Sequence, residues 1–228
     1  MKVLAVDTSA QIASVAVVDE SGLIGEFTLN HGKTHSQMLI HMIAELLSKL
    51  EMSPKDIDLF AASIGPGSFT GLRIGVTSIK SMAYAMDKPV IGVSTLDALA
   101  YGIRSKERII CPMMDARNNY VFTALYKWEN RKQIKLTEYM WVNVSDLIKQ
   151  LKEKNSKIIF NGDAANMHKD LLETELGEAC DFAPENLMLQ MGSSVAYIAL
   201  KKAAKGMTES CYDLVPFYLR KSQAEREG

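Results

Sequence analysis

The sequence predicts an α/β protein made of two halves, each with the order strand, strand, strand, helix, strand, helix. Three observations carry this prediction. Short apolar runs end at acids or glycines, longer runs repeat apolar residues at helical spacing, and the same order of runs occurs twice. An apolar content of 47% and a charged content of 23% in 228 residues provide for a sizeable core and argue against disorder.

The first half opens with three strands joined by short turns, so we expect them to be antiparallel neighbours. A helix follows in which apolar residues recur every three or four positions until Ser53-Pro54 ends it. The predicted elements are strands at 2–7, 13–19 and 23–29, a helix through 39–50, a strand at 57–64, a helix at 74–86, a strand at 89–93 and a helix at 95–103.

The second half repeats this pattern, although not the letters, and becomes less regular after about residue 175. The charged segment 104–108 marks the boundary, which gives domains 1–104 and 105–228. The predicted elements are strands at 108–115, 120–128 and 134–142, a helix at 144–153, a strand at 157–160, a helix after the turn 161–165, a last helix at 187–205 and a tail from 215.

Two facing halves of this kind form the actin, sugar-kinase and heat-shock ATPase architecture, a ribonuclease H-like fold. In that fold a strand ending in an acid and a turn points from each half into a central cleft. The corners here are Asp7-Thr8-Ser9 and Asp115-Ala116-Arg117, joined by Asp163 as a candidate nucleotide cleft. Structural alternatives stay open: Asp7 could bond nearby backbone N–H groups, Asp115 and Arg117 could form an ion pair, and Asp163 could cap a helix.

Composition excludes several classes of function. A net charge of −1 argues against direct, charge-driven binding of nucleic acid. The three cysteines form no C-x-x-C pair, so neither a disulfide framework nor a zinc ribbon is indicated, and a cytoplasmic location fits. The N-terminus reaches Asp7 too early for a signal peptide, and no apolar run approaches the roughly 20 residues of a membrane helix.

A glycine turn over residues 63–73, Ser-Ile-Gly-Pro-Gly-Ser-Phe-Thr-Gly-Leu-Arg, lies between a strand and a helix. Such a turn either directs backbone N–H groups at an anion or lets two backbones approach closely. The turn has no lysine and no G-K-[ST], so it is not a P-loop, and packing is the favoured interpretation.

The two helices of the first half carry more small and apolar surface than one face needs. Gly71 and Gly75 each cost about 1 kcal/mol against alanine, which close helix contact would offset. Met38, Ile40 and Leu47 lie off the main apolar stripe. We therefore expect a sheet on one side and a partner protein on the other; the alternative is complete burial within the monomer. The predicted partner interface is His35, Leu39, Met42, Ile43, Phe69, Gly71, Leu72, Gly75, Val76 and Ile79.

Histidines supply no convincing metal site. His31 and His35 are four residues apart, but Gly32 lies between them and no H-E-x-x-H pattern follows. His35 is expected at a helix start with Thr34 as its cap. His41 adds no further spacing pattern, His168 is expected at the surface, and no Ser-His-Asp or Cys-His arrangement is present, so neither metal ligands nor catalytic residues are predicted.

In its motifs the sequence resembles the TsaB family, also called YeaZ, the bacterial partner of the tRNA threonylcarbamoyladenosine transferase TsaD. The resemblance covers nearly the whole chain and rests most on residues 63–77, the glycine turn and the start of its helix. Further matching segments are Val6 to Ser9, His35-Ser36, Val93 to Ala100, Asp115 to Arg117, and Pro216 to Arg220 with Ala224-Glu225.

Departures from the family pattern bear on catalysis. Asn118 to Phe122 stands where the family often has Arg-x-Glu-Val-Tyr, and Gly162 to Ala165 lacks the second glycine of Gly-Asp-Gly-Ala, which weakens a nucleotide role for that corner. TsaD binds its metal through an H-x-x-x-H pair just after the fifth strand. The matching residues here, Val93 to Ala100, contain no histidine.

The resemblance therefore implies a non-catalytic scaffold or activator of TsaD in the modification of the adenosine beside the anticodon of ANN-decoding tRNAs. It implies that the two helices pack on the same helices of TsaD, or on a second copy in a homodimer, and that the ATPase TsaE joins the complex. It implies that tRNA is reached only through the complex, with no tightly bound cofactor and with ATP or ADP held only at a complex interface. The alternatives are an independent ATPase or kinase of the same fold, or a metallopeptidase-like enzyme of the glycoprotease superfamily.

Overall fold

The computed structural model describes residues 1–30 and 35–220, except for the side chain of His35. Contacts divide the chain into two compact units. Unit 1 contains Met1–Ala98 and Gln190–Tyr218, and unit 2 contains Leu99–Leu189 with Leu219 and Arg220. The units thus divide the chain differently from the predicted halves, because residues 190–218 return to the N-terminal unit.

Unit 1 is built on a five-stranded sheet with the order β3-β2-β1-β4-β5. The first three strands pair antiparallel, as predicted, and the last two run parallel to β1. The strands are β1 (Val3–Asp7), β2 (Ala13–Asp19), β3 (Gly22–Leu29), β4 (Leu59–Gly65) and β5 (Val90–Ser94).

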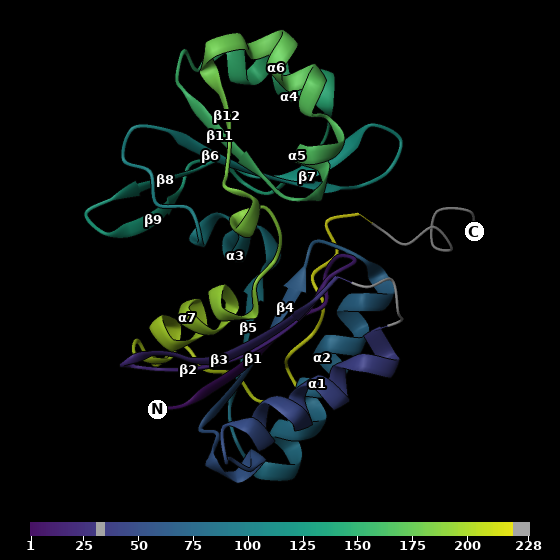
Figure 1. The fold of residues 1–228 in the computed structure, drawn as a ribbon, viewed down its shortest axis with the longest axis vertical. Coiled ribbons are helices and arrows are strands. Elements are labelled where there is room, and N and C mark those ends of the chain that lie inside the picture. Colours follow the sequence, from purple (N-terminus) through teal and green to yellow (C-terminus); the bar gives the residue numbers. More distant parts are fainter. Residues whose placement is uncertain (31–34, 221–228) are drawn as a thin grey trace. The chain divides into compact units, whose positions relative to one another are not determined.

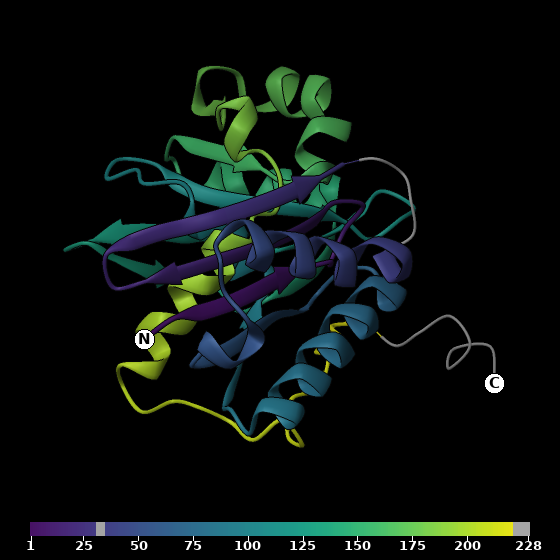
Figure 2. The same ribbon diagram turned by 60° about the horizontal axis from the view of Figure 1, so that its bottom comes forward.

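Helices cover both faces of this sheet (Figure 1). The helices α1 (His35–Lys49) and α2 (Phe69–Met86) lie side by side on one face (Figure 2), and α7 (Gly192–Ala203) lies on the other. Because side chains alternate along a strand, Leu4 and Val6 of β1 pack beneath α1 and α2, while Val3 and Ala5 pack beneath α7. Two separate apolar layers therefore hold the unit together, each fully buried leucine or valine contributing about 1.5–3 kcal/mol.

Helix α2 begins five residues before the predicted start at residue 74. The side chain of Ser68 caps it by accepting a hydrogen bond from the N–H of Gly71 at 3.2 Å. Asp87 ends it in a left-handed conformation with φ of 52°. The Ser68 cap therefore starts the helix within the turn that the apolar pattern assigned to a loop.

Unit 2 contains a seven-stranded sheet whose main path is β10-β7-β6-β11-β12; β8 pairs with β6, and β9 pairs with β8. Its strands are β6 (Ile109–Asp115), β7 (Tyr120–Thr123), β8 (Tyr126–Glu129), β9 (Lys132–Lys135), β10 (Met140–Asn143), β11 (Ile158–Asn161) and β12 (Cys180–Phe182). Its helices are α4 (Val144–Glu153), α5 (Asp163–Met167) and α6 (Lys169–Leu176), while α3 (Thr95–Tyr101) spans the change from one unit to the other. Short 3-10 turns lie at Pro54–Asp56 in unit 1 and at Gly177–Ala179 and Glu185–Leu187 in unit 2.

Two predicted strands of this unit are wrong as continuous elements, because each is two strands. The run 120–128 divides into β7, which pairs with β6 and β10, and β8, which pairs with β6 and β9. Leu125 lies between the two strands; its N–H donates to Thr137 Oγ1 at 3.0 Å and its carbonyl accepts from the N–H of Leu136 at 2.7 Å. The run 134–142 divides in the same way into the end of β9 and the start of β10.

The last helix also differs from its prediction, since it begins at Gly192 instead of residue 187 and is preceded by a 3-10 turn. Strand β12 had no counterpart in the sequence prediction. In the part of the chain that the structure describes, no helix combines the length and the apolar character needed to span a bilayer.

Candidate functional site

The glycine turn after β4 is packed against other segments of unit 1. A Cβ on Gly65, which has φ of +125°, would lie 2.3 Å from the carbonyl oxygen of Phe217. A Cβ on Gly67 would lie 2.3 Å from the carbonyl oxygen of Ser9, and the N–H of Ser68 donates to that oxygen at 2.6 Å. These glycines are needed for close approach of backbones, so the contacts support the packing interpretation of the turn.

The corner at the end of β1 is fully buried and bonded within unit 1. Asp7 Oδ1 accepts hydrogen bonds from the N–H of Ser9 at 2.9 Å and from its hydroxyl at 2.6 Å. Thr8 Oγ1 donates to the carbonyl of Gly71 at 2.7 Å. This is the local strand-end turn that was the structural alternative for Asp7, and it fastens β1 to the first turn of α2.

The second corner, in unit 2, brings Asp115 and Asp163 together. Asp163 Oδ1 accepts from the N–H of Asp115 at 3.2 Å and from the N–H of Ala164 at 3.0 Å, so the carboxylate does bond the start of the following helix. Burial raises the pKa of the Asp163 carboxyl above its ordinary value, against the lowering effect of these hydrogen bonds.

Arg117 does not form the expected buried ion pair. Its side chain is exposed, and its contact with Asp115 is a hydrogen bond from the backbone N–H to Oδ1 at 2.8 Å. Arg117, Asn118 and Asn119 all have left-handed backbone conformations, with φ of 65°, 54° and 60°. The tight hairpin between β6 and β7 leaves Arg117 exposed, and no ion pair joins it to Asp115, so the expected buried pair is corrected accordingly.

Most of the predicted interface residues lie inside unit 1, which corrects their assignment as a partner surface. The apolar stripes of α1 and α2 face the sheet and are no more than 3% exposed. These residues are Leu39, Met42 and Ile43 of α1 and Leu72, Val76 and Ile79 of α2. The alternative of burial within the monomer therefore holds for them.

The two helical glycines also serve contacts within the unit. Gly71 is buried and accepts the Thr8 hydroxyl, and a Cβ on Gly75 would lie 2.4 Å from Thr8 Oγ1. Phe69 is half-buried and stacks on Tyr218, with ring centroids 4.7 Å apart. His35 opens α1, but its side chain lies outside the described residues, as do His31 and Thr34.

An outer flank of the same two helices is accessible. Ile40, one of the residues off the main stripe, is 52% exposed, and Ala44 one turn further along α1 is also exposed. On α2, Ile74 and Met82 are half-buried. We call these four residues the outer flank. Of the surplus residues named in the sequence, Ile40 belongs to it, whereas Leu47 is buried and Met38 is half-buried.

The described residues contain no cluster of metal-ligating side chains, and neither Cys111 nor Cys180 is activated. Within this part of the chain no three His, Cys, Asp or Glu side chains gather as a metal site, His41 is exposed, and His168 is half-buried between α5 and α6. Burial raises the pKa of the Cys111 thiol to about 12 and that of Cys180 to about 11, so neither is a ready nucleophile.

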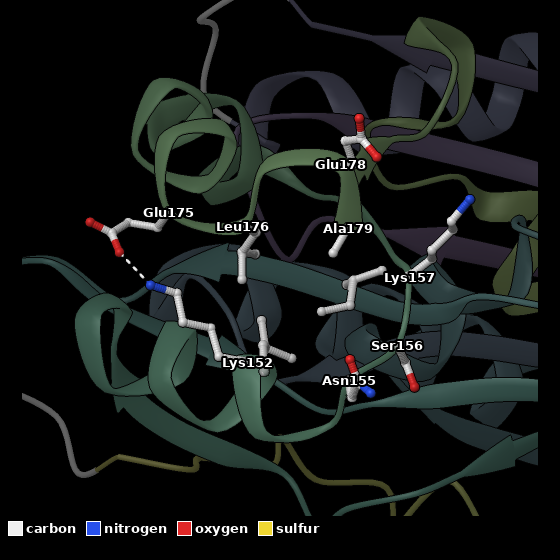
Figure 3. Close-up of a pocket in the computed structure, with 10 residues that line it drawn as sticks. Lys152, Asn155, Ser156, Lys157, Glu175, Leu176, Glu178 and Ala179 are labelled. Atoms are coloured by element: carbon white, nitrogen blue, oxygen red, sulfur yellow. Dashed lines mark hydrogen bonds and ion pairs between the residues drawn. The ribbon is translucent and has the colours of Figure 1, made fainter.

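A surface pocket of about 330 Å³ lies in unit 2 beside the ends of α4 and α6 (Figure 3). Leu151, Ile158 and Leu176 supply apolar lining, and an ion pair between Lys152 and Glu175 at 2.6 Å lies at its rim. Its exposed charges are of both signs, and its described lining residues contain no nucleophile beside a base. This pocket offers no catalytic arrangement.

Comparison with solved structures confirms the predicted fold class. A Pseudomonas aeruginosa protein described as similar to peptidase YeaZ matches with a TM-score of 0.81 and 22% identity, covering 96% of this chain and 99% of that one. A ROK hexokinase from Thermus thermophilus, a sugar kinase, matches with a TM-score of 0.51 and 11% identity, covering 89% of this chain and 100% of that one. At these identities the likeness shows the fold alone.

Sequence comparison shows the family. The family model described as TsaD, tRNA N6-adenosine threonylcarbamoyltransferase, matches residues 23–228. The tRNA threonylcarbamoyladenosine biosynthesis protein TsaB of Bacillus subtilis is 33% identical over 99% of this chain and 96% of its own length. TsaB of Haemophilus influenzae is 28% identical over 96% of this chain and 94% of its own length. The chain, with its strand-end corners and its glycine-rich second helix, belongs to the TsaB family of tRNA threonylcarbamoyladenosine biosynthesis proteins.

Proposed function

We propose that this chain acts in the biosynthesis of tRNA threonylcarbamoyladenosine as a non-catalytic partner of TsaD. The observation that carries the proposal is the relationship to the Bacillus subtilis TsaB over 99% of this chain and 96% of that protein. A match of that extent includes both units, so the whole architecture is shared and not only one motif.

The residues after β5 support the assignment of the chemistry to the partner. Helix α3 begins at Thr95, directly after the strand. By the family resemblance, residues 93–100 correspond to the segment that carries the H-x-x-x-H pair of TsaD, and they contain no histidine. This segment therefore lacks the imidazole ligands of such a metal site.

The outer flank of α1 and α2 is the proposed contact with TsaD. Ile40 and Ala44 are exposed, Ile74 and Met82 are half-buried, and small or apolar side chains of this kind let two helix pairs approach closely. The same surface would serve a homodimer when TsaD is absent. We further propose that TsaE joins this complex, that tRNA is bound only by the complex, and that ATP or ADP is held only at a subunit interface.

Co-expression with TsaD and TsaE of the same host, followed by size-exclusion chromatography, tests the proposal. Ile40→Glu is expected to weaken the TsaD complex by about 30-fold or more, because it places a charge at the centre of an apolar contact. Leu171→Glu is the matched control, since Leu171 is 40% exposed on α6 in unit 2. Loss of the complex in both variants, or in neither, would refute the proposed surface.

The isolated chain also distinguishes this role from that of an independent ATPase. Titration calorimetry with Mg-ATP is expected to show no micromolar binding and no turnover by this chain alone. Tight binding with hydrolysis would contradict the scaffold role and favour the ATPase.

A further inference from the structure

A second surface of unit 1 lies on the opposite flank of α1, away from α2 and independent of the proposed TsaD contact. A groove of about 430 Å³ is lined by residues of strand β3 and of α1, two elements that Figure 2 shows at the edge of the sheet. This volume is within the range of about 300–1,000 Å³ that is common for binding sites. Its lining residues are Glu26, Phe27, Thr28, Leu29, Met38, His41, Met42 and Glu45.

Four consecutive strand residues, 26–29, line this groove. Successive side chains of a strand point to opposite faces of a sheet, so a groove that touches all four runs along the strand edge itself. In an antiparallel pair, every second residue directs its N–H and C=O away from its neighbour. The backbone of β3 thus presents a row of donors and acceptors to this groove.

The two edge strands of the unit 1 sheet differ in whether another segment of the chain covers them. At the far edge, Val90 of β5 is covered by Glu209 of the chain's own later segment through two backbone hydrogen bonds, at 3.0 and 2.9 Å. Strand β3 pairs only with β2 among the described residues. It contains neither lysine nor proline, which are the residues that commonly guard an exposed edge.

Its one charged residue, Glu26, is held on the α7 side. Oε1 of Glu26 accepts from the N–H of Ser193 at 2.9 Å, and Oε2 accepts from the Ser193 hydroxyl at 3.0 Å. The edge between Glu26 and Leu29 is therefore both unguarded and free of a strand partner in the described structure.

Side-chain chemistry selects the kind of partner. Phe27, Leu29 and Met38 supply accessible apolar surface, and Met38 can adapt to different side chains, whereas Met42 is almost fully buried. The lining residues include the carboxylates of Glu26 and Glu45 and contain neither lysine nor arginine. A second copy of this chain, pairing β3 with β3, would bring the same carboxylates against each other, which disfavours a homodimer here.

We propose that the β3–α1 groove binds an extended segment of another protein in which basic and apolar residues alternate. The segment adds a sixth strand to the unit 1 sheet through backbone hydrogen bonds to residues 26–29. Its apolar side chains enter between Phe27 of β3 and Met38 of α1, and its basic side chains approach Glu45.

Selection from a display library of random 12-residue peptides on the immobilised full chain tests this proposal. We expect enrichment of alternating basic and apolar sequences, whose affinity is then measured by fluorescence anisotropy. Leu29→Lys, at a position 39% exposed in the groove, should weaken the selected peptides by about tenfold or more. Leu23→Lys is the matched control, because Leu23 is 50% exposed on the same strand outside the groove.

Reversing the charge of Glu45 provides a second test of the proposal. Glu45 is exposed, so Glu45→Lys is expected to leave the fold intact while it weakens the basic peptides and strengthens acidic peptides of the same length. The proposal is overturned if no peptide is enriched, if enriched peptides are indifferent to Leu29→Lys, or if their charge preference survives the reversal. Concentration-dependent dimers that Leu29→Lys abolishes, seen by analytical ultracentrifugation, would instead identify a second copy as the occupant and overturn the proposed partner.

Discussion

Replacement of Gly75 by alanine is expected to destabilise unit 1, although alanine is the better helix former. The new methyl group would lie 2.4 Å from Thr8 Oγ1, well inside van der Waals contact. Thr8 would have to move and would lose its buried hydrogen bond to the carbonyl of Gly71, now 2.7 Å long. The clash with Thr8 therefore outweighs the gain in helix propensity, and the substitution lowers the stability of unit 1.

The magnitudes can be compared directly. Alanine gains about 1 kcal/mol of helix propensity over glycine. An unsatisfied buried hydroxyl costs about 1–3 kcal/mol, and overpacking costs a further 1–3 kcal/mol. The net expectation is a loss of about 1–5 kcal/mol, and each kcal/mol lowers the melting temperature of a chain of this size by about 2–4 °C.

A double-mutant cycle with Thr8→Ala tests this reasoning by urea unfolding followed by circular dichroism. In the Thr8→Ala background the alanine at position 75 meets Val6 Cγ2 at 3.5 Å, an ordinary contact, so the substitution should be neutral or stabilising. We expect a coupling energy of about 2 kcal/mol or more. Equal effects of Gly75→Ala in both backgrounds, or a stabilised single variant, would refute the proposed contact.

Two further predictions concern half-buried carboxylates. Burial raises the pKa of the Asp163 carboxyl in the folded chain. The contribution of this carboxyl to the free energy of unfolding is therefore fully present below the pKa of the unfolded chain, and it is lost as the pH rises through the folded pKa. Asp163→Asn should therefore match or exceed the wild type in stability at neutral pH and lose this pH dependence in thermal unfolding, whereas the exposed control Glu153→Gln should behave like the wild type. Glu26→Ala should cost about 1–2 kcal/mol, because the start of α7 loses the carboxylate that accepts from Ser193; an unchanged urea midpoint would contradict that role.

The strands and helices of unit 1 could be predicted from the sequence because their signals are local. Buried runs such as 13–19 end at turn residues, and the stripe of α1 repeats at helical spacing. The division of 120–128 into two strands could not be predicted in this way. The run 120–128 contains no turn residue that would mark a break, and the contacts at Leu125 are hydrogen bonds with residues 136 and 137, which lie between β9 and β10.

The contacts of the candidate site could also be predicted only in part, because they join residues far apart in the sequence. The pattern of α2 indicated that Gly75 needs a close neighbour, but a pattern does not say whether that neighbour belongs to the same chain. The neighbour is Thr8, and the bond that joins this corner to α2 spans 63 residues of sequence. The surplus residue Ile40, in contrast, is exposed, because it lies outside the stripe that the sheet covers.

The discontinuity of unit 1 has a consequence for synthesis on the ribosome. The first 98 residues contain every strand of its sheet, but α7, which covers the face formed by Val3, Ala5 and Ala61, is made only after all of the described core of unit 2. The nascent chain must therefore carry an uncovered apolar sheet face through most of translation. A stop codon shortly before Gln190 would leave that face permanently open, so we expect late truncations to be removed by proteolysis or to aggregate, although they keep all five strands.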